Sequence, residues 1–381
     1  MTEVEPIPGG RDVELMISEE QRALVDVVRK WLAGCTDLAR ARADRDATGL
    51  VRRGDVAQAA GLGLIGLLRA AEGGTHADLA LVVEELGRAG SPLPVGQAAV
   101  VCLLLDEADI GGDAAERIAS GELIAVLAAA EPGQPPVRAV RSGADLVLTG
   151  TAGHVIGGSD AGLLLVAAVT DEGRDVLALV GADGSGITRT WRTALDLTRD
   201  LTCVAVDGAV AGPDHWAEVT PEVRRRLLDV ATVHQAADAV GAADALLERT
   251  VQYVKERSQF GVAVGSFQAV KHHAANMALD VQCARLTVRA AAHALDEDAA
   301  VDRARRIANA GSLAKEACSR VAGTALQLHG GMGFTWEHDL HLYLRRIKTS
   351  ELLGGTPRHH RGALADVLLS SERISSTAAA A

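Results

Sequence analysis

The chain has 381 residues, of which 48% are hydrophobic and 23% are charged, so it can bury a large core and is long enough for roughly two or three domains. Its formal net charge of -12 argues against nucleic acids and anionic membrane surfaces as partners, because neither would gain from charge attraction or counterion release. That charge opposes an acidic small ligand only weakly, since a local basic patch can override the global sign.

Helical patterns dominate the first part of the chain. Ser18 with Gln21 makes a capping-box pattern, which predicts the start of a helix. Two amphipathic runs, Val56–Leu68 and His76–Arg88, are separated by glycine-rich turns. Glu84 and Glu85, which are adjacent in the second run, are interpreted as part of a solvated helix face. These patterns predict an N-terminal helical domain over residues 1–122.

The pattern changes near residue 123, where short runs rich in Val, Leu and Ala alternate with turns that contain Gly, Asp and Pro. Such runs are typical of β-strands. They predict a middle β domain over residues 123–219. The strands expected are Leu123–Ala129, Ala144–Leu148, Gly162–Ala168, Val176–Val180 and Thr202–Val206.

Long helices are predicted from residue 220 onward. Thr220 is expected to cap a helix that has Pro221 at its first position and runs to about Gln259. Ser266 is expected to cap the next helix. Because the turns between the long helices are short, they should pack as a four-helix-type bundle over residues 220–375. Further helices are expected at 301–328, 338–351 and 358–371, so the fold class is α+β.

Cysteine usage and the absence of targeting signals favour a cytoplasmic protein. The five cysteines are scattered and form no CxxC pair, which favours reduced thiols and predicts neither disulfides nor a zinc site or other metal centre. The first residues lack the apolar segment of a signal peptide. No run of about 18 apolar residues is present that would predict a membrane span.

Two motifs in the C-terminal part could bind a ligand. In the first, Arg257 and Phe260 precede Gly261 at the end of a long helix. The second, Leu326–Phe334 (LQLHGGMGF), places a glycine pair after another helix. Each motif alone has an ordinary explanation, a helix end with a basic residue and a glycine cap. Together they are more specific, because adjacent glycines let a backbone approach a ligand closely.

Read together, these motifs resemble the C-terminal signature of the acyl-CoA dehydrogenases, and Gly333–Arg346 (GFTWEHDLHLYLRR) resembles their actinobacterial members. The resemblance covers nearly the whole chain and implies the fold of that family: an N-terminal helical domain, a middle β domain and a C-terminal four-helix bundle. It also implies FAD as cofactor and the α,β-dehydrogenation of an acyl-CoA. In the family, the two motifs bind the nucleotide part of the FAD of a neighbouring protomer. The FAD-binding residues implied here are Arg257, Gln259, Phe260, Gln327, Gly330 and Gly331, with Thr356 in a later loop.

The catalytic base of the family is missing from its expected position. Most members carry a glutamate where an ungapped count reaches Gly354, and a glycine cannot accept a proton. A minority carry the base in a helix, at a position that falls near 231–232, where no carboxylate stands. Glu351 is the first candidate for a displaced base, with Asp229 and Glu248 as alternatives, although each is more typical of solvated surface.

The loop that would contact the protomer's own flavin is also reduced. Residues 130–133 read Ala-Glu-Pro-Gly and lack the Gly-Ser-Asp that usually follows, and His154 stands near the position of a usual Trp. The missing residues therefore all belong to the site that this chain would form for its own flavin and substrate. Some family members are α2β2 heterotetramers, and this chain resembles their subunit without a base. The resemblance suggests a steroid side-chain CoA as the substrate. The alternatives are a self-sufficient homo-oligomer with a displaced base and a homologue without flavin or activity.

Overall fold

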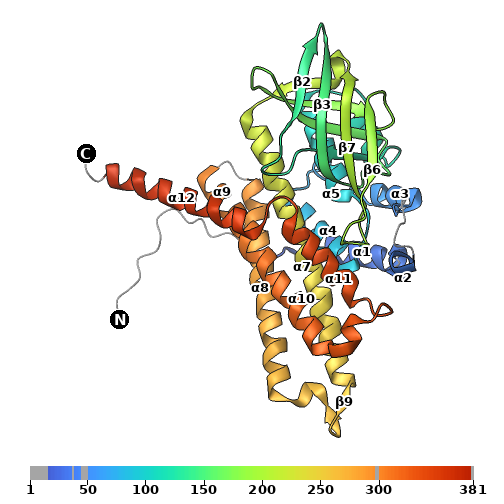
Figure 1. Cartoon of the computed structure of the whole chain (residues 1–381), viewed down its shortest axis with the longest axis vertical. Coiled ribbons are helices and arrows are strands. Elements are labelled where there is room, and N and C mark those ends of the chain that lie inside the picture. Colours follow the sequence, from blue (N-terminus) through green and yellow to red (C-terminus); the bar gives the residue numbers. More distant parts are fainter. Residues whose placement is uncertain (1–15, 37, 44–49, 297–299, 379–381) are drawn as a thin grey trace.

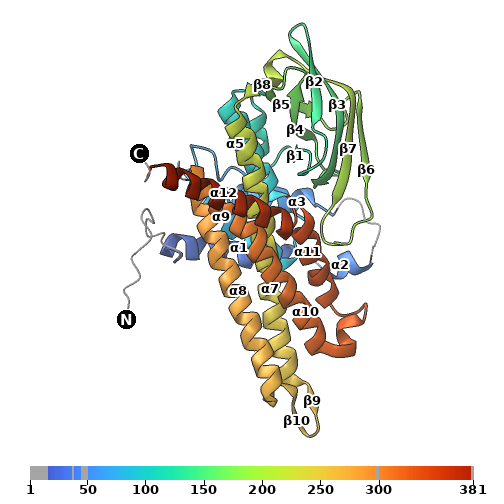
Figure 2. The ribbon, with the colours of Figure 1, turned by 60° about the vertical axis from the view of Figure 1, so that its left-hand side comes forward.

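The computed structural model describes residues 16–36, 38–43, 50–296 and 300–378. The expectation about a signal peptide therefore falls on residues that lie outside this part. Figures 1 and 2 show a group of helices, a β-sheet above them and a bundle of long helices below the sheet. The α+β class and the order of helical, β and helical parts are confirmed. No helix in the described part combines the length and apolar character that a membrane span requires.

The N-terminal helices follow the predicted pattern in part. The Ser18 hydroxyl accepts the Gln21 N–H at 3.1 Å, and the Gln21 side chain accepts the Ser18 N–H, so the predicted capping box is confirmed. The predicted run Val56–Leu68 is wrong in length, since its helix ends at Gly61 and Gly63 then takes a φ of 73°. The helices are α1 (Glu19–Cys35), α2 (Leu38–Ala43), α3 (Arg53–Gly61), α4 (His76–Ala89), α5 (Val95–Ala108) and α6 (Ala114–Ala119).

The adjacent glutamates of α4 are buried, so their interpretation as a solvated face is wrong. Glu84 pairs with Arg285 at 2.7 Å, and Glu85 pairs with Arg29 at 2.6 Å. Burial raises the pKa of the Glu84 carboxyl, which the Arg285 charge opposes. Helix α4 is covered on both faces by other helices, and the arginines that balance its acids come from distant parts of the chain.

The middle part forms an eight-stranded sheet of order β6-β7-β3-β2-β4-β5-β8, with β1 paired to β4. The predicted strands are too few, since β2 is missed, and all but Leu123–Ala129 are too short, since β3, for example, runs on to Ile156. The β2 sequence, VRAVRS, carries two arginines on its exposed positions, which hid its strand pattern. The strands are β1 (Ala125–Ala128), β2 (Val137–Ser142), β3 (Asp145–Ile156), β4 (Leu163–Thr170), β5 (Asp175–Gly181), β6 (Ile187–Trp191), β7 (Leu201–Ala211) and β8 (Trp216–Val219).

The C-terminal helices pack into the predicted bundle. Thr220 caps α7 as expected. The Ser266 cap is wrong, because α8 begins after Phe267 and the Ser266 hydroxyl donates to the Ala263 carbonyl instead. The predicted helix 301–328 contains a π-helical turn over residues 310–314. The elements are α7 (Pro221–Glu256), the hairpin β9 (Ser258–Gln259) and β10 (Val262–Ala263), α8 (Gln268–Leu295), α9 (Ala300–Asn309), α10 (Lys315–His329), α11 (Leu340–Leu352) and α12 (Pro357–Ala378).

Helices α4 and α7 approach each other backbone to backbone. A Cβ atom at Gly241 of α7 would stand 1.8 Å from the Glu84 carbonyl oxygen of α4. In the other direction, a Cβ atom at Gly87 of α4 would stand 2.1 Å from the Asp238 carbonyl oxygen. Only glycine fits at these two positions, which fixes the N-terminal helices against the bundle.

A buried ion network joins the sheet to the bundle. The Asp238 carboxylate of α7 pairs with Arg346 of α11 at 2.6 Å and with Arg199 at 3.3 Å. Arg199, which lies just before β7, also pairs with Asp196 at 2.6 Å. Arg346 reaches the Ser91 carbonyl at 2.9 Å, at the end of α4. The N-terminal helices, the sheet and the bundle are therefore joined at the Asp238 carboxylate.

Candidate functional site

A cavity of about 480 Å³ lies where the sheet meets the bundle. This volume lies within the range of roughly 300–1,000 Å³ that small-molecule sites occupy. Its walls come from the loop after β1, from β3, from the segment before β7 and from the junction of α11 and α12. The polar residues that line it are Glu131, Gln134, His154, Arg192, Thr193, Thr349, Thr356 and His359.

This cavity is lined by His154 and Thr356, two residues that the sequence analysis associated with a flavin. His154 lies within a register shift of the β3–β7 pairing, between Ala152 and Val155. Such bulges change the direction of side chains near functional sites. Thr356 caps α12 through a hydroxyl that accepts the His359 N–H at 3.2 Å. The cavity wall therefore combines the shortened loop at residue 131, the bulge in β3 and the start of α12.

The two positions at which the resemblance places a catalytic base lie next to each other. Gly354 has a φ of 66°, and a Cβ atom there would stand 3.8 Å from the Thr232 nitrogen. It would also stand 3.9 Å from the Ala231 carbonyl carbon. Ala231 and Gly354 line one small cavity of about 60 Å³. Neither position supplies a carboxylate, and only the structure reveals that they are neighbours.

The loop that contains Gly354 is held by two buried side chains. The Lys315 ammonium is fully buried and donates to the Leu353 carbonyl at 2.6 Å and to the Gly355 carbonyl at 3.0 Å. His360 lies 3.0 Å from the Gly354 carbonyl through its Nε2 atom. Burial lowers the pKa of Lys315 to about 8. Three successive carbonyl groups are thus bonded by side chains of α10 and α12, which fixes the loop.

The sequence analysis missed Glu131 as a functional candidate. Its Oε2 atom accepts the Gly354 N–H at 2.8 Å. It is the single carboxylate among the described residues that line the cavity of about 480 Å³ and the smaller one beside Gly354. A glutamate between a strand and a Pro-Gly turn was visible in the sequence, but its contact with a residue more than two hundred positions away was not.

The carboxylates considered from the sequence lie elsewhere. Glu351 accepts from Ser319 and pairs with Lys348, both at 2.9 Å. Glu248 forms an exposed ion pair with Arg88. Asp229 faces α9, and burial raises its pKa to about 6. None of the three is among the residues that line the cavities beside Gly354.

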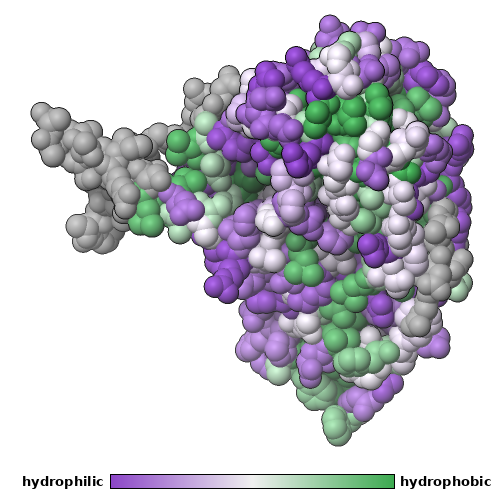
Figure 3. All heavy atoms as spheres, turned by 45° about the horizontal axis from the view of Figure 1, so that its top comes forward, coloured by the Kyte–Doolittle hydropathy of each residue, from purple (hydrophilic) through white to green (hydrophobic). Residues whose placement is uncertain are grey.

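The other predicted cofactor residues lie in or beside the hairpin of β9 and β10, which Figure 1 shows at the end of the bundle far from the sheet, and at the end of α10 or in the turn after it. Phe260 is 93% exposed with a φ of 53°, and the Arg257 guanidinium makes no hydrogen bond or ion pair with the described residues. Tyr253 stacks on His329 at 4.4 Å, which brings the two motifs together. Figure 3 shows apolar surface at this tip. The exposed residues of the second motif include Gln327, Gly330 and Gly331, and Gln259 lies on the hairpin.

Neither glycine of the pair is crowded. A Cβ atom at Gly330 or Gly331 would meet no other atom within 4 Å, and Gly330 has a φ of 57°. The backbone of this turn is therefore open to a ligand from outside the chain. The exposed guanidinium, the exposed ring and the open backbone fit the nucleotide part of a flavin cofactor, since a guanidinium fork matches phosphate oxygens and a flat ring stacks on a base.

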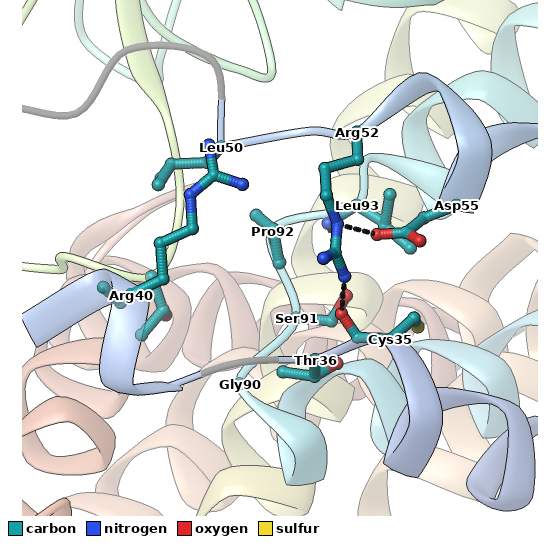
Figure 4. Close-up of a pocket in the computed structure, with 12 residues that line it drawn as sticks. Cys35, Thr36, Arg40, Leu50, Arg52, Asp55, Gly90, Ser91, Pro92 and Leu93 are labelled. Carbon is teal, nitrogen blue, oxygen red and sulfur yellow. Dashed lines mark hydrogen bonds and ion pairs between the residues drawn. The ribbon is translucent and has the colours of Figure 1, made fainter.

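A further cavity near α1 and α3 is a packing gap (Figure 4). It measures about 30 Å³, which is room for little more than one water molecule. Arg52 on its wall donates to the Asp55 carboxylate at 2.8 Å and to the Cys35 carbonyl. Its size and these contacts favour a structural role.

The structure predicts that His360 makes the protein sensitive to acid. Burial and the nearby charge of Lys315 lower the pKa of His360 from 6.5 to about 4. As the pH falls below 6.5 the unfolded chain takes up this proton and the folded chain does not, so stability falls until about pH 4. This contribution is at most about 1.4 kcal/mol per pH unit.

The variant His360→Gln keeps a donor for the Gly354 carbonyl but has no group that titrates in this range. We expect its free energy of unfolding to fall less steeply with decreasing pH than that of the wild type. Urea unfolding at pH 7.0, 6.0 and 5.0 would measure it. An identical pH dependence in wild type and variant would contradict the prediction.

Comparisons with known proteins agree with these features. Residues 222–369 match the acyl-CoA dehydrogenase C-terminal domain. The acyl-CoA dehydrogenase IpdE2 of Mycobacterium tuberculosis is 32% identical over 294 residues, which are 75% of this chain and 76% of IpdE2. The acyl-CoA dehydrogenase FadE34 of the same organism is 33% identical over 355 residues, and these cover 90% of this chain but 47% of FadE34. The chain thus spans about half the length of FadE34.

Solved structures give the same fold. The structure described as the Tcur3481–Tcur3483 steroid ACAD superposes with a TM-score of 0.84 at 26% identity. The match covers 93% of this chain and 99% of that one.

Proposed function

The chain belongs to the acyl-CoA dehydrogenase family, and we propose that it is a flavoprotein subunit that completes the FAD site of a homologous partner subunit. The assembled complex would carry out the α,β-dehydrogenation of an acyl-CoA. A steroid side-chain CoA is the proposed substrate, a choice supported by the steroid ACAD to which the chain is similar. FAD, when bound, supplies the hydride acceptor.

The separation of the two regions carries this proposal. The hairpin of β9 and β10 stands at the end of the bundle far from the sheet (Figure 1), whereas the cavity of about 480 Å³ is lined by β3 and by the junction of α11 and α12. One cofactor cannot occupy both regions of one protomer if the long helices keep them apart. The residues that would hold the nucleotide of a neighbour's FAD are Arg257, Gln259, Phe260, Gln327, Gly330 and Gly331.

Co-expression with a homologous acyl-CoA dehydrogenase subunit tests the proposal. We expect the flavin absorption band to appear after gel filtration of the complex and to be absent from the chain purified alone. Flavin in the chain alone would instead favour a homo-oligomer, in which each copy lends its hairpin to another. The cavity of about 480 Å³ is the observation that favours this second candidate. Absence of flavin from the complex would overturn both.

The side chain of Arg257 is expected to matter for cofactor affinity. Charge-assisted hydrogen bonds contribute about 1.5–3 kcal/mol, so Arg257→Ala should weaken FAD binding by the complex about 10- to 150-fold. Titration of the flavin-free complex with FAD, followed by fluorescence, would measure this change.

The matched control is Lys255→Ala. It removes the same charge from an exposed residue two positions earlier, on the last turn of α7. We expect the control to change FAD affinity less than about 2-fold, since a solvated charge contributes little. Equal losses in the two variants would mean that only net charge matters and that Arg257 makes no specific contact.

A further inference from the structure

We propose that the outward face of α8 is the surface on which the homologous partner subunit docks. The inference rests on the proposed function, because the partner is the subunit whose FAD site this chain completes. It goes further by naming the part of the molecule that holds that subunit. This surface, called the α8 stripe below, consists of Gln268, His272, Ala275, Leu279, Cys283 and Leu286.

The α8 stripe lies on the solvent side of its helix. Its members follow one another at steps of three or four residues, so they share one face. The opposite face carries Met277, Val281, Ala284 and Val288, which are buried in the core. Helix α8 packs against α7 and α10, and Figures 1 and 2 show it along one side of the bundle. The stripe is therefore open to another molecule.

The exposed residues of α8 carry almost no charge. Lys271 is the single exposed Lys, Arg, Asp or Glu of this helix, all of which the structure describes. The shorter helix α1 exposes six such residues. They are Glu19, Glu20, Arg22, Asp26, Arg29 and Lys30. A helix that faces water normally carries charges on its outer side, whereas charged residues are depleted at the centre of protein–protein interfaces. The composition of the α8 stripe is therefore that of an interface.

Two leucines form the centre of the α8 stripe. Leu279 is 63% exposed and Leu286 is 40% exposed, and the exposed Cys283 lies between them. Seven residues of a helix span about 10 Å, so these three side chains form one continuous apolar patch. A partner that covers the patch removes apolar surface from water, which favours association.

The α8 stripe is too small to hold a partner by itself. From Gln268 to Leu286 it is about 27 Å long, and a width of about 10 Å gives it roughly 300 Å². A stable interface buries about 800 Å² on each partner. Further exposed apolar surface lies next to the stripe, because the hairpin with Phe260 and Val262 leads through Phe267 directly into α8. A partner that covers both the hairpin and the stripe approaches the required area.

A homologous subunit is the occupant that these features favour. The proposed function places the FAD of the partner at the hairpin, so the partner lies beside the first turn of α8. A helix that binds a membrane surface carries Lys and Arg on its polar side. The α8 stripe instead begins with Gln268 and His272, whose side-chain nitrogens lie 3.1 Å apart. An uncharged helix face is complementary to another helix, and a subunit of the same fold has a long helix at the corresponding place.

The thiol of Cys283 tests the inference without any substitution. The chain alone and the co-expressed complex would be treated with N-ethylmaleimide, and mass spectrometry would follow the labelling of each cysteine. We expect Cys283 to be labelled in the chain alone and to lose this labelling in the complex. Cys35, which is half-buried at the end of α1, is the internal reference and should react equally in both samples.

The variant Leu279→Asp tests the same surface through affinity. It would bury a carboxylate without a counter-charge at the centre of the interface, so association with the partner should weaken by about 30-fold or more. The matched control is Val27→Asp on α1, which is 48% exposed on a face that already carries charges. The control should change the affinity by about 2-fold or less, since residues outside an interface contribute little. Analytical ultracentrifugation would measure both, and circular dichroism would check that both variants fold.

Equal labelling of Cys283 in the chain alone and in a flavin-containing complex would overturn the inference and leave the proposed function standing. Wild-type affinity of Leu279→Asp in such a complex would have the same meaning. Protection of Cys283 in a complex without flavin would support the docking surface and reject the proposed function. Protection in the chain alone, with a homo-oligomer in gel filtration, would assign the α8 stripe to a second copy and overturn the choice of partner. Failure to form any complex would overturn both proposals.

Discussion

Replacing Asp238 with Ala is expected to lower the free energy of unfolding by about 3–5 kcal/mol, which is the usual loss when one member of a buried ion pair is removed. The side chains of Asp238, Arg346 and Arg199 are 7%, 2% and 4% exposed. Without Asp238, Arg346 would keep only neutral acceptors among the described residues, such as the Ser91 carbonyl. Arg199 would then keep Asp196 as its one charged partner in that part of the chain. A buried guanidinium without a counter-charge is more costly than the lost bonds themselves.

Urea unfolding at pH 7 would measure the loss, and Asp280→Ala is the matched control. Asp280 pairs with Arg320 at 2.7 Å, but that arginine is 54% exposed. The free energy of unfolding of the control should therefore fall by less than about 1 kcal/mol. Similar losses in the two variants would mean that the Asp238 network contributes no more than a surface pair. The Asp238 variant should also loosen the cavity wall, since the segment that holds Arg199 continues into Leu201 of that wall.

The order of helices and strands could be predicted because it depends on local patterns. The capping box at Ser18, the cap at Thr220 and the glycine stop at Gly330 are all encoded within a few residues. Strand β2 could not be found in this way, because its exposed arginines broke the apolar pattern. Its place in the sheet depends on pairing with β3 and β4.

The burial of the α4 glutamates was unpredictable for a related reason. Their partners, Arg29 and Arg285, stand far away in sequence. From the sequence alone, a charged residue is predicted to be exposed to solvent unless its partner of opposite charge is known. Local patterns therefore predict the elements better than they predict which polar residues those elements bury.

The candidate site shows the same limit. The sequence motifs placed Arg257 and Gly330 on helix ends, and the structure brings these ends together through Tyr253 and His329. The neighbourhood of Gly354 and Ala231, and the bond from Gly354 to Glu131, involve separations of more than one hundred residues. The contact between Glu131 and Gly354 could not be predicted from the sequence, because it joins residues that are close only in the folded chain.

The second large effect is expected at the crossing of α4 and α7, where Gly241→Ala should lower the free energy of unfolding by about 3 kcal/mol. The added methyl group would stand 1.8 Å from the Glu84 carbonyl oxygen and 2.7 Å from the Arg88 nitrogen. Both are backbone atoms of α4, so the two helices must move apart. Overpacking of this kind costs about 1–3 kcal/mol, occasionally more, and the lack of a flexible neighbour places this case at the upper end.

Gly323→Ala on α10 is the matched control for the helix crossing. A Cβ atom at Gly323 would meet no other atom within 4 Å, and the residue is exposed. Alanine has the higher helix propensity by about 1 kcal/mol, so the control should be slightly more stable than the wild type. The same substitution in two helices should therefore shift thermal unfolding in opposite directions. If Gly241→Ala unfolds at the wild-type temperature, the helices have room at their crossing and the close approach of α4 to α7 does not hold the N-terminal helices to the bundle.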